Sequence, residues 1–304
     1  MRPSRPGSAA SLGGGPRPEA SVAEEPQGRD CLSLAGLPPQ VHPTAVVEPG
    51  AELAADVRIG PHCVLSADTV VGRGTVLENH VTTMGRVTIG ERNRIFPNCV
   101  IGGEPQDISY RGTATRVEIG DGNLIREGVT INRASEKEEG VTSVGSGNFL
   151  MACCHVAHDC RIGDHVTIAN GTLLGGHVRI QSHAALSGAV AVHHWATIGS
   201  WSFVAGLSRV LHDVPPFMLC EGAPARPRCI NTVALERGGF GRAVIEAIAE
   251  AHRILFRAKV GLEKAREILE ARQELPVEVA ELLGFLARQQ EGRHGRSRER
   301  RRAA

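Results

Sequence analysis

Seven of the thirteen histidines fall within residues 155–194, and five of these are considered first: His155, His158, His177, His193 and His194. Two further groups accompany them, because Asp159 follows the second histidine and Gly176 precedes the third. An imidazole beside a carboxylate can act as a general base, and the unshielded N–H of a glycine can stabilise a developing oxyanion. No serine or cysteine there has the neighbours of a covalent nucleophile. These residue types predict direct acyl transfer from a bound thioester to a base-activated acceptor.

The elements that must position these groups follow a period of six. An aliphatic or near-aliphatic residue recurs at every sixth position over residues 41–101, 119–131 and 144–210. This period fits neither an α-helix nor a lone amphipathic strand, and it is the signature of a hexapeptide-repeat parallel β-helix. Three short strands form one coil, so residues eighteen apart stack about 4.8 Å from each other. We therefore expect an all-β parallel β-helix, followed by a C-terminal α-helical region.

Stacking in eighteens gathers the histidine cluster on one edge of the coil. His158 lies under Gly176, which lies under His194, and Asp159 lies under His177 in the next column. The groups should fall within about 10 Å, two strand spacings. The glycine is expected to leave a notch between two imidazoles where a substrate could sit. We interpret His158 as the general base, Asp159 as its support and the Gly176 N–H as the oxyanion donor.

A second stack places His165 under His183, and His183 under Trp201. It has neither a carboxylate nor a glycine beside it, so it is interpreted as a surface ladder without a catalytic function. Single histidines of this kind are more often structural than catalytic.

The eight cysteines favour a structural role over a metal site or disulfides. Four of them lie two residues before a position of the hexad ladder, where small apolar residues otherwise stand: Cys63, Cys99, Cys154 and Cys160. We expect them to fill the coil wall, in a protein of the reducing cytosol, and no C-x-x-C pair indicates a metal. The net charge of +1 gives no reason to expect nucleic acid binding. No apolar stretch approaches the roughly twenty residues of a transmembrane segment.

Composition divides the chain into four parts. Residues 1–30 lack the apolar core of a signal peptide and are expected to be a disordered extension. The repeat body covers residues 31–214 and is interrupted by insertions at 102–118 and 132–143, which are favoured places for binding. A proline-rich connector and three helical patterns follow over residues 215–290, and residues 291–304 are expected to be a basic, solvated, disordered tail.

Several motifs together resemble the bacterial UDP-N-acetylglucosamine O-acyltransferases of lipid A synthesis. They extend from about Val41 to Arg288 and comprise TRVEIG at 115–120, VGSGNFLM at 144–151, HVAHDC at 155–160, GGHV at 175–178, AVH at 191–193, DVPP at 213–216 and RGGF at 237–240. The resemblance implies a left-handed coil, an exception to the usual crossover handedness. It also implies a cytoplasmic bacterial homotrimer with active sites between subunits, and acyl carrier protein with its 4′-phosphopantetheine arm as the acyl donor, without a cofactor or metal.

The resemblance also implies a role for individual residues. His158 would take the proton of the glucosamine 3-hydroxyl, supported by Asp159, with the Gly176 N–H as oxyanion donor. Contacts to the sugar and phosphates are implied for His155, His177, His193 and the adjacent His194. Gln106 and Asp107 would hold the sugar from the neighbouring subunit, Asn231 and Arg237 would contact the nucleotide, and Gly206 would limit the acyl chain length, leaving room for a longer chain.

Four positions depart from the family pattern: Ser109, His194, Pro224 and Gly238. They surround the acceptor and leave the proton-transfer residues unchanged, which suggests a divergent paralogue with altered affinity or acceptor. Alternatives are N-acyl transfer to a UDP-amino sugar, a trimeric zinc enzyme of the γ-carbonic-anhydrase kind, and a non-catalytic β-helix binding protein. The N-acyltransferases carry an additional N-terminal domain for which residues 1–30 are too short, and the HVAHD motif and C-terminal helices disfavour the zinc enzyme.

Overall fold

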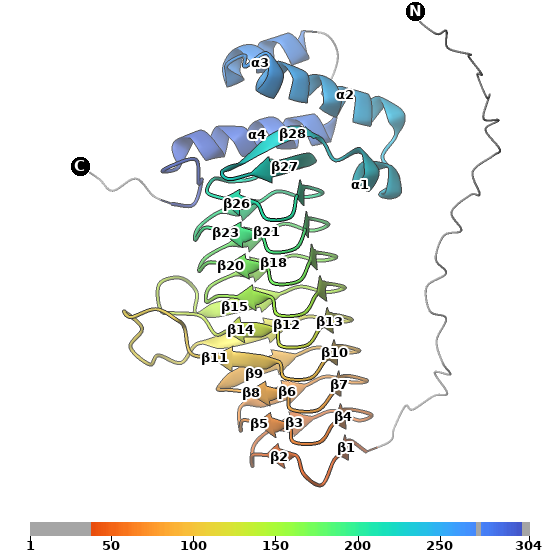
Figure 1. The fold of residues 1–304 in the computed structure, drawn as a ribbon, viewed down its shortest axis with the longest axis vertical. Coiled ribbons are helices and arrows are strands. Elements are labelled where there is room, and N and C mark those ends of the chain that lie inside the picture. Colours follow the sequence, from red (N-terminus) through yellow and green to blue (C-terminus); the bar gives the residue numbers. More distant parts are fainter. Residues whose placement is uncertain (1–37, 272–274, 300–304) are drawn as a thin grey trace, which may run out of the picture. The chain divides into compact units, whose positions relative to one another are not determined.

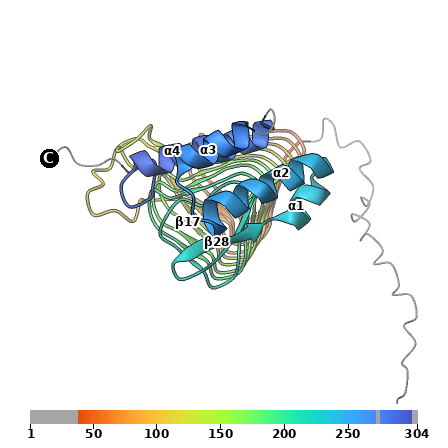
Figure 2. The same ribbon diagram turned by 90° about the horizontal axis from the view of Figure 1, so that it is seen from above.

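The computed structural model describes residues 38–271 and 275–299 (Figure 1). The extension expected at residues 1–30 lies outside this part. The described residues belong to one unit, a parallel β-helix followed by helices that gather at its C-terminal end (Figures 1 and 2). No helix in the described part of the chain is long and apolar enough to cross a membrane.

Three walls form the coil, and we number them in the order in which the chain enters them. The first wall contains β1 (Gln40–Val41), β4 (Arg58–Ile59), β7 (Val76–Leu77), β10 (Arg94–Ile95), β13 (Leu124–Ile125), β16 (Phe149–Leu150), β19 (Thr167–Ile168), β22 (Ala185–Leu186), β25 (Phe203–Val204), β27 (Met218–Gly222) and β28 (Ala225–Ile230). The second contains β2 (Val46–Val47), β5 (Val64–Leu65), β8 (Thr82–Thr83), β11 (Val100–Gly103), β14 (Thr130–Asn132), β17 (His155–Val156), β20 (Leu173–Leu174), β23 (Ala191–Val192) and β26 (Arg209–Val210). The third contains β3 (Glu52–Leu53), β6 (Thr69–Val71), β9 (Arg86–Ile89), β12 (Arg116–Ile119), β15 (Val141–Val144), β18 (Arg161–Ile162), β21 (Arg179–Ile180) and β24 (Thr197–Ile198).

The strand register confirms that residues eighteen apart stack on successive coils. His155 pairs with Leu173, and Leu173 pairs with Ala191, each eighteen residues further along the chain. The register jumps where the two insertions leave the coil, as in the pairing of Ile101 with Ile131. Both insertions connect the second wall to the third, and they are shorter than expected, at residues 104–115 and 133–140, because strands β11, β12, β14 and β15 extend into the predicted ranges.

The hexad ladder fills the inside of the coil, as predicted. Its residues are buried from Ile59 to Val210, whereas Val41 is 41% exposed because the first coil has no coil beneath it. The four cysteines assigned to the wall are 0–1% exposed, and the Cys63 thiol donates a hydrogen bond to the backbone carbonyl of Glu78 at 2.8 Å. Their predicted role as small buried wall residues is confirmed.

An asparagine ladder closes the edge between the third and first walls. Asn93, Asn123 and Asn148 are buried on successive coils. The Asn93 side-chain oxygen accepts from both the backbone N–H and the side-chain amide of Asn123, each at 2.9 Å. The Asn123 oxygen in turn accepts from the Asn148 N–H at 2.8 Å. The side chains thus satisfy backbone donors that the turn would otherwise leave buried without partners.

The connector after the coil contains structure that the sequence reading missed. Strands β27 and β28 form an antiparallel hairpin where a proline-rich linker was expected. Prolines at 215, 216, 224 and 227 obscure its two-residue alternation. The helices that follow are α1 (Thr232–Arg237), which was also missed, α2 (Arg242–His252), the π-helical turn η1 (Arg253–Arg257), α3 (Leu262–Glu270) and α4 (Val277–Glu291). The three predicted helical patterns are confirmed, and α4 packs against α2 and α3.

The prediction of a disordered tail at residues 291–304 is wrong as far as Glu299. Residues 292–299, which we call the C-terminal strap, fold back onto the last coil. Asp213 donates its N–H to the Gly295 carbonyl and accepts from the Ser297 N–H, both at 2.8 Å. Arg296 is 5% exposed and donates to the Leu211 carbonyl. The charged residues of the strap suggested a solvated segment, but acceptor groups at the end of the coil form hydrogen bonds with the strap. Residues 300–304 lie outside the described part.

Candidate active site

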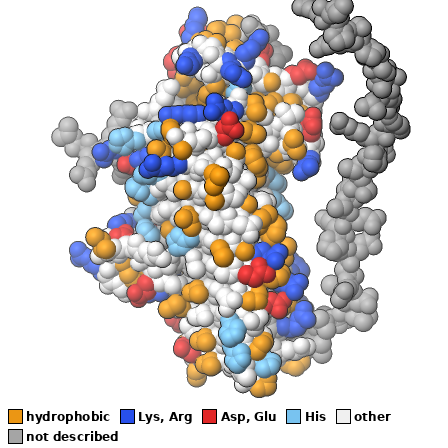
Figure 3. All heavy atoms as spheres, viewed as in Figure 1, with side chains coloured by type: hydrophobic (Ala, Val, Ile, Leu, Met, Phe, Trp, Pro, Cys, Tyr) orange, Lys and Arg blue, Asp and Glu red, His pale blue; other side chains and the backbone are white. Residues whose placement is uncertain are grey.

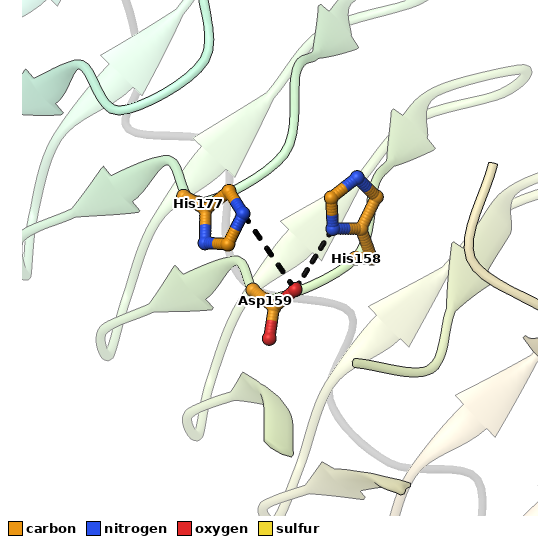
Figure 4. A group of neighbouring side chains, drawn as sticks. All are labelled: His158, Asp159 and His177. Atoms are coloured by element: carbon orange, nitrogen blue, oxygen red, sulfur yellow. Dashed lines mark hydrogen bonds and ion pairs between the residues drawn. The ribbon is translucent and has the colours of Figure 1, made fainter. Parts of the chain in front are cut away.

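The predicted catalytic residues lie on the edge between the second and third walls, which we call the catalytic edge. His158 and Asp159 occupy the turn between β17 and β18, and Gly176 and His177 occupy the same turn one coil further. The His177 N–H donates to the His158 carbonyl at 3.0 Å, which confirms the predicted stacking. Figure 4 shows Asp159 between the two imidazole rings. The sequence reading therefore placed these groups together correctly.

His158 and Asp159 form a buried hydrogen-bonded pair. His158 Nδ1 lies 2.8 Å from Asp159 Oδ2, which also accepts from the Ser135 N–H at 3.0 Å and its hydroxyl at 2.6 Å. Burial raises the pKa of Asp159, but hydrogen bonds from His158 and Ser135 outweigh it and lower the pKa. An ionised Asp159 fixes Nδ1 as the bonded nitrogen and leaves Nε2 to take a proton. Ser135, from the second insertion, was missed because nothing in its spacing relates it to the hexads.

The His158 ring packs directly against Gly176. A Cβ at this position would lie 2.5 Å from His158 Cε1 and 2.6 Å from Nε2, so any side chain would displace the base. The space expected to be an open notch is thus occupied by the imidazole itself. In the described part of the chain, no acceptor pairs with the Gly176 N–H. This N–H can therefore donate to an oxyanion that forms beside His158 Nε2.

His177 is enclosed within the cluster. Its ring stacks on Trp195 with centroids 3.9 Å apart and is 4% exposed. Nδ1 lies 3.1 Å from Glu138 Oε2, and Nε2 lies 3.8 Å from Asp159 Oδ2. Substrate contact by His177 stays a prediction. Trp195 could have been found from the sequence, because it is eighteen residues after His177.

The cluster also has the spacing of a possible cation site. Ligand atoms of His158, Asp159 and His177 lie within 4.8 Å of one another. However, Asp159 Oδ2 already accepts hydrogen bonds from three donors, two of which come from Ser135. A metal ion at that oxygen would have to displace them. The donor set fits a proton-transfer pair better than a metal centre.

Three further histidines lie on the catalytic edge, and Figure 3 shows histidine side chains along the margin from which the insertions project. His155 in β17 bonds through Nδ1 to the Thr130 hydroxyl at 2.8 Å, and burial together with the charge of His158 lowers its pKa. The rings of His193 and His194 are 3.9 Å apart, and burial together with His193 lowers the pKa of His194. Lowered pKa values keep His155 and His194 neutral, so each can both donate and accept hydrogen bonds.

The two insertions are tied together by an ion pair. Asp107 Oδ2 lies 2.5 Å from Lys137 Nζ, and its Oδ1 accepts from the Ser109 N–H and hydroxyl. These contacts hold the pKa of Asp107 well below its usual range, Lys137 contributing most. Gln106 beside it is exposed. Lys137 thus places a cation from the second insertion beside Asp107.

Asn231 and Arg237 lie on a different edge, between the third and first walls. They line a cavity of about 540 Å³ together with His165, His183 and Trp201. The three rings stack as predicted, at 5.1 Å and 4.1 Å between centroids. His165 is exposed and the other two rings are half-buried, so the predicted surface ladder also forms one wall of this cavity. A Cβ at Gly238 would lie 2.6 Å from the Trp201 ring, so a larger residue there would have to displace the indole.

Gly206 occupies the third edge, between β25 and β26, where the first wall meets the second. The predicted site residues are therefore divided among the three edges of one chain. Only the catalytic edge gathers His155, His158, Asp159, Gly176, His177, His193 and His194, with the insertion that carries Gln106 and Asp107. A single chain does not bring Asn231, Arg237 or Gly206 to His158.

Comparison with known proteins gives a consistent result. The family model described as UDP N-acetylglucosamine O-acyltransferase, domain 2, matches residues 213–295, and the bacterial transferase hexapeptide model matches residues 142–176. The chain is 44% identical over 254 residues to an acyl-[acyl-carrier-protein]–UDP-N-acetylglucosamine O-acyltransferase of Syntrophobacter fumaroxidans, covering 83% of this chain and 98% of that protein.

Solved structures agree. A UDP-N-acetylglucosamine acyltransferase from Bacteroides fragilis superposes with a TM-score of 0.79 at 33% identity, covering 82% of this chain and 97% of the other. The enzyme from Francisella novicida gives 0.78 at 37% identity, covering 82% and 91%. The match extends over both the coil and the helices that follow it.

Proposed function

This chain belongs to the acyl-[acyl-carrier-protein]–UDP-N-acetylglucosamine O-acyltransferases, and on that premise we propose that it transfers an acyl chain from acyl carrier protein to the 3-hydroxyl of UDP-N-acetylglucosamine. The fold is the left-handed parallel β-helix of the family, followed by a C-terminal helical region. The observation that carries the proposal is the buried His158–Asp159 pair, whose ring lies against the Gly176 backbone.

The proton path follows from the bonding of the His158 ring. Asp159 holds Nδ1, so Nε2 accepts the proton of the sugar 3-hydroxyl as its oxygen attacks the thioester carbonyl. The Gly176 N–H donates to the oxyanion of the tetrahedral intermediate. Collapse of this intermediate forms the ester, breaks the C–S bond and releases the thiolate, which receives the proton from Nε2. The Asp159 carboxylate stabilises the imidazolium in between.

The substrate contacts combine groups from more than one edge. We assign the acceptor sugar and its phosphates to His155, His177, His193, His194 and the insertion residues Gln106 and Asp107. Asn231 and Arg237 are assigned to the nucleotide, since a guanidinium suits a diphosphate. The separation of these residues on different edges of one chain supports a homotrimer with each site between two subunits. The chain-length ruler at Gly206 belongs to the same proposal.

The donor is acyl carrier protein, whose 4′-phosphopantetheine arm delivers the thioester as a substrate, so that no separate cofactor or metal takes part. We place the reaction in the bacterial cytoplasm, at the first step of lipid A synthesis. The family name of the relatives favours O-acylation over N-acyl transfer and over a non-catalytic binding role.

One assay tests the proposed function. Purified protein is incubated with a panel of acyl carrier protein thioesters and UDP-N-acetylglucosamine, and the products are analysed by mass spectrometry. We expect a UDP-sugar heavier by one acyl group, with an ester that alkali hydrolyses. A product formed only with a 3-amino acceptor, or no product with any thioester, would contradict the proposal.

A further inference from the structure

We propose that Arg298 of the C-terminal strap and Glu138 of the second insertion are positioning residues that hold His177 against the His158–Asp159 pair. The inference rests on the proposed function. The family model matches residues only up to Gly295, so Arg298 lies beyond that match. Neither residue touches the reacting atoms, and both act through His177.

Arg298 makes three contacts with the catalytic edge. Its Nη2 lies 2.6 Å from Glu138 Oε1, and its Nη1 donates to the backbone carbonyl of His177. The guanidinium also lies over the indole of Trp195, 5.4 Å from the ring centroid. The Arg298 and Glu138 side chains are 14% and 21% exposed, so water screens their ion pair less than it would at an open surface.

Glu138 transmits this contact to the imidazole. One of its oxygens faces Arg298, and the other lies 3.1 Å from His177 Nδ1. Burial raises the pKa of Glu138, but the hydrogen bond with His177 and the charge of Arg298 outweigh it and lower the pKa to about 2. The carboxylate is therefore ionised at neutral pH and held between two donors.

His177 carries the contact on to the reacting pair. The far nitrogen of its ring lies 3.8 Å from Asp159 Oδ2, the oxygen that binds His158. The His177 and His158 rings also meet edge to face, with centroids 5.2 Å apart. A continuous series of contacts therefore links Arg298, Glu138, His177, Asp159 and His158. Loss of either end should allow the His177 ring to move and the geometry of the base to relax.

The strap is anchored independently of Arg298, which makes the inference testable. Ser297 bonds to Asp213 and Arg296 bonds to the Leu211 carbonyl, so an Arg298 variant should keep the strap in place. The same segment offers a matched control, because Arg293 is exposed and makes no ion pair with any residue that the structure describes. Arg293→Gln removes the same charge from the same strap.

The experiment compares Arg298→Gln, Glu138→Gln, their double variant and Arg293→Gln in steady-state assays of the full-length protein. We expect Arg298→Gln and Glu138→Gln each to lower kcat about tenfold. The KM for the acyl carrier protein thioester should stay within about twofold. The double variant should lose about as much kcat as the less active single variant, because the residues act through one contact. Arg293→Gln should match the parent, and melting temperatures identify a variant that fails to fold.

The pH profile separates positioning from a structural role. Around His158 lie Asp159, His155 and His177, and behind them Glu138, Arg298 and His194. Removing the negative charge of Glu138 should move the acid-side midpoint of kcat/KM to lower pH, and removing the positive charge of Arg298 should move it to higher pH. Loss of folding would not shift the two in opposite directions.

The outcomes distinguish this inference from the proposed function. An active parent whose Arg298→Gln and Glu138→Gln variants behave like Arg293→Gln overturns the positioning role alone, as does a shift of both midpoints in the same direction. If Arg298→Gln fails to fold, Glu138→Gln decides the question from the other end of the ion pair. A parent protein without acyl transfer overturns both proposals.

Discussion

The His158 ring lies directly over the α-carbon of Gly176, so the base and the proposed oxyanion donor depend on each other. The close approach leaves no room for a methyl group, since a Cβ would come within 2.6 Å of two ring atoms. Substitution at Gly176 should therefore act on catalysis by displacing His158, even though its N–H is retained.

Gly176→Ala should lower kcat at least about tenfold and change the melting temperature little, because the strain falls on one side chain. Gly261→Ala is the matched control: it stands just before α3, its added Cβ would have no neighbour within 4 Å, and it should be close to the parent in rate. Steady-state kinetics and thermal melts measure both. Equal rates for the two variants would mean that the position of His158 does not depend on the absence of a side chain at Gly176.

The residues of the catalytic edge could be predicted from the sequence only where they follow the six-residue period. The stacking rule predicted the contacts among four residues, because Gly176 lies eighteen residues after His158 and His177 eighteen after Asp159. Within each pair of neighbours, the two residues stand in adjacent columns. Ser135 and Glu138 were missed because they lie in an insertion, where stacking gives no register. Their contacts depend on how the loop folds back, which a six-residue pattern does not encode.

Among the elements, the asparagine ladder bears on stability and not on the reaction. Asn123 is 0% exposed, and its side chain both donates to Asn93 and accepts from the Asn148 N–H. Removing it leaves the buried Asn148 N–H without a partner and takes one of two donors from the Asn93 side-chain oxygen, which keeps the backbone N–H of residue 123.

Asn123→Ala should lower the free energy of unfolding by about 1–3 kcal/mol, measured by urea denaturation. The control is Asn79→Ala, a half-buried residue outside the ladder, which should change it by less than about 0.5 kcal/mol. The same loss in both variants would show that the ladder contributes nothing specific.

The coil and three helices could be predicted because a period of six or a helical pattern persists over many residues. The β27–β28 hairpin and α1 could not, since each is short and proline-rich sequence surrounds the hairpin. The strap was read as a solvated charge run, but Asp213 and the Leu211 carbonyl, some eighty residues earlier, provide its partners. Such distant contacts leave no local signal in the sequence.

For the whole molecule, the distribution of site residues over separate edges has a direct consequence. His158 lies on the catalytic edge and Arg237 on the edge between the third and first walls. If the site forms between subunits, the two residues of one working site come from different chains.

Mixed trimers test this arrangement together with the proposed homotrimer. His158→Ala and Arg237→Ala should each have low activity alone, whereas trimers assembled from both chains should regain activity, because some interfaces then combine two intact edges. The assay is acyl transfer after co-expression with two different affinity tags and sequential purification. Activity no higher than the sum of the separate variants would contradict a shared site.

Stability should also depend on pH through histidines whose pKa values are lowered in the folded protein. These are His155, His183, His194 and His252, with burial the largest cause in each. In the unfolded chain these histidines take up protons near their usual pKa of about 6.5, whereas in the folded chain they stay neutral to lower pH. Acidification therefore favours unfolding. The free energy of unfolding from urea titrations should therefore fall between about pH 7.5 and pH 6. A constant or rising value would contradict this sign.

The most direct test of the central claim is the acyl transfer rate of His158→Ala, measured with acyl carrier protein thioester and UDP-N-acetylglucosamine. The account predicts a loss of at least about 10²-fold in kcat, with the oligomeric state and melting temperature of the parent, because Nε2 of this residue carries the proton. A variant that folds like the parent and transfers at a near-normal rate would contradict the mechanism and the assignment of the catalytic edge.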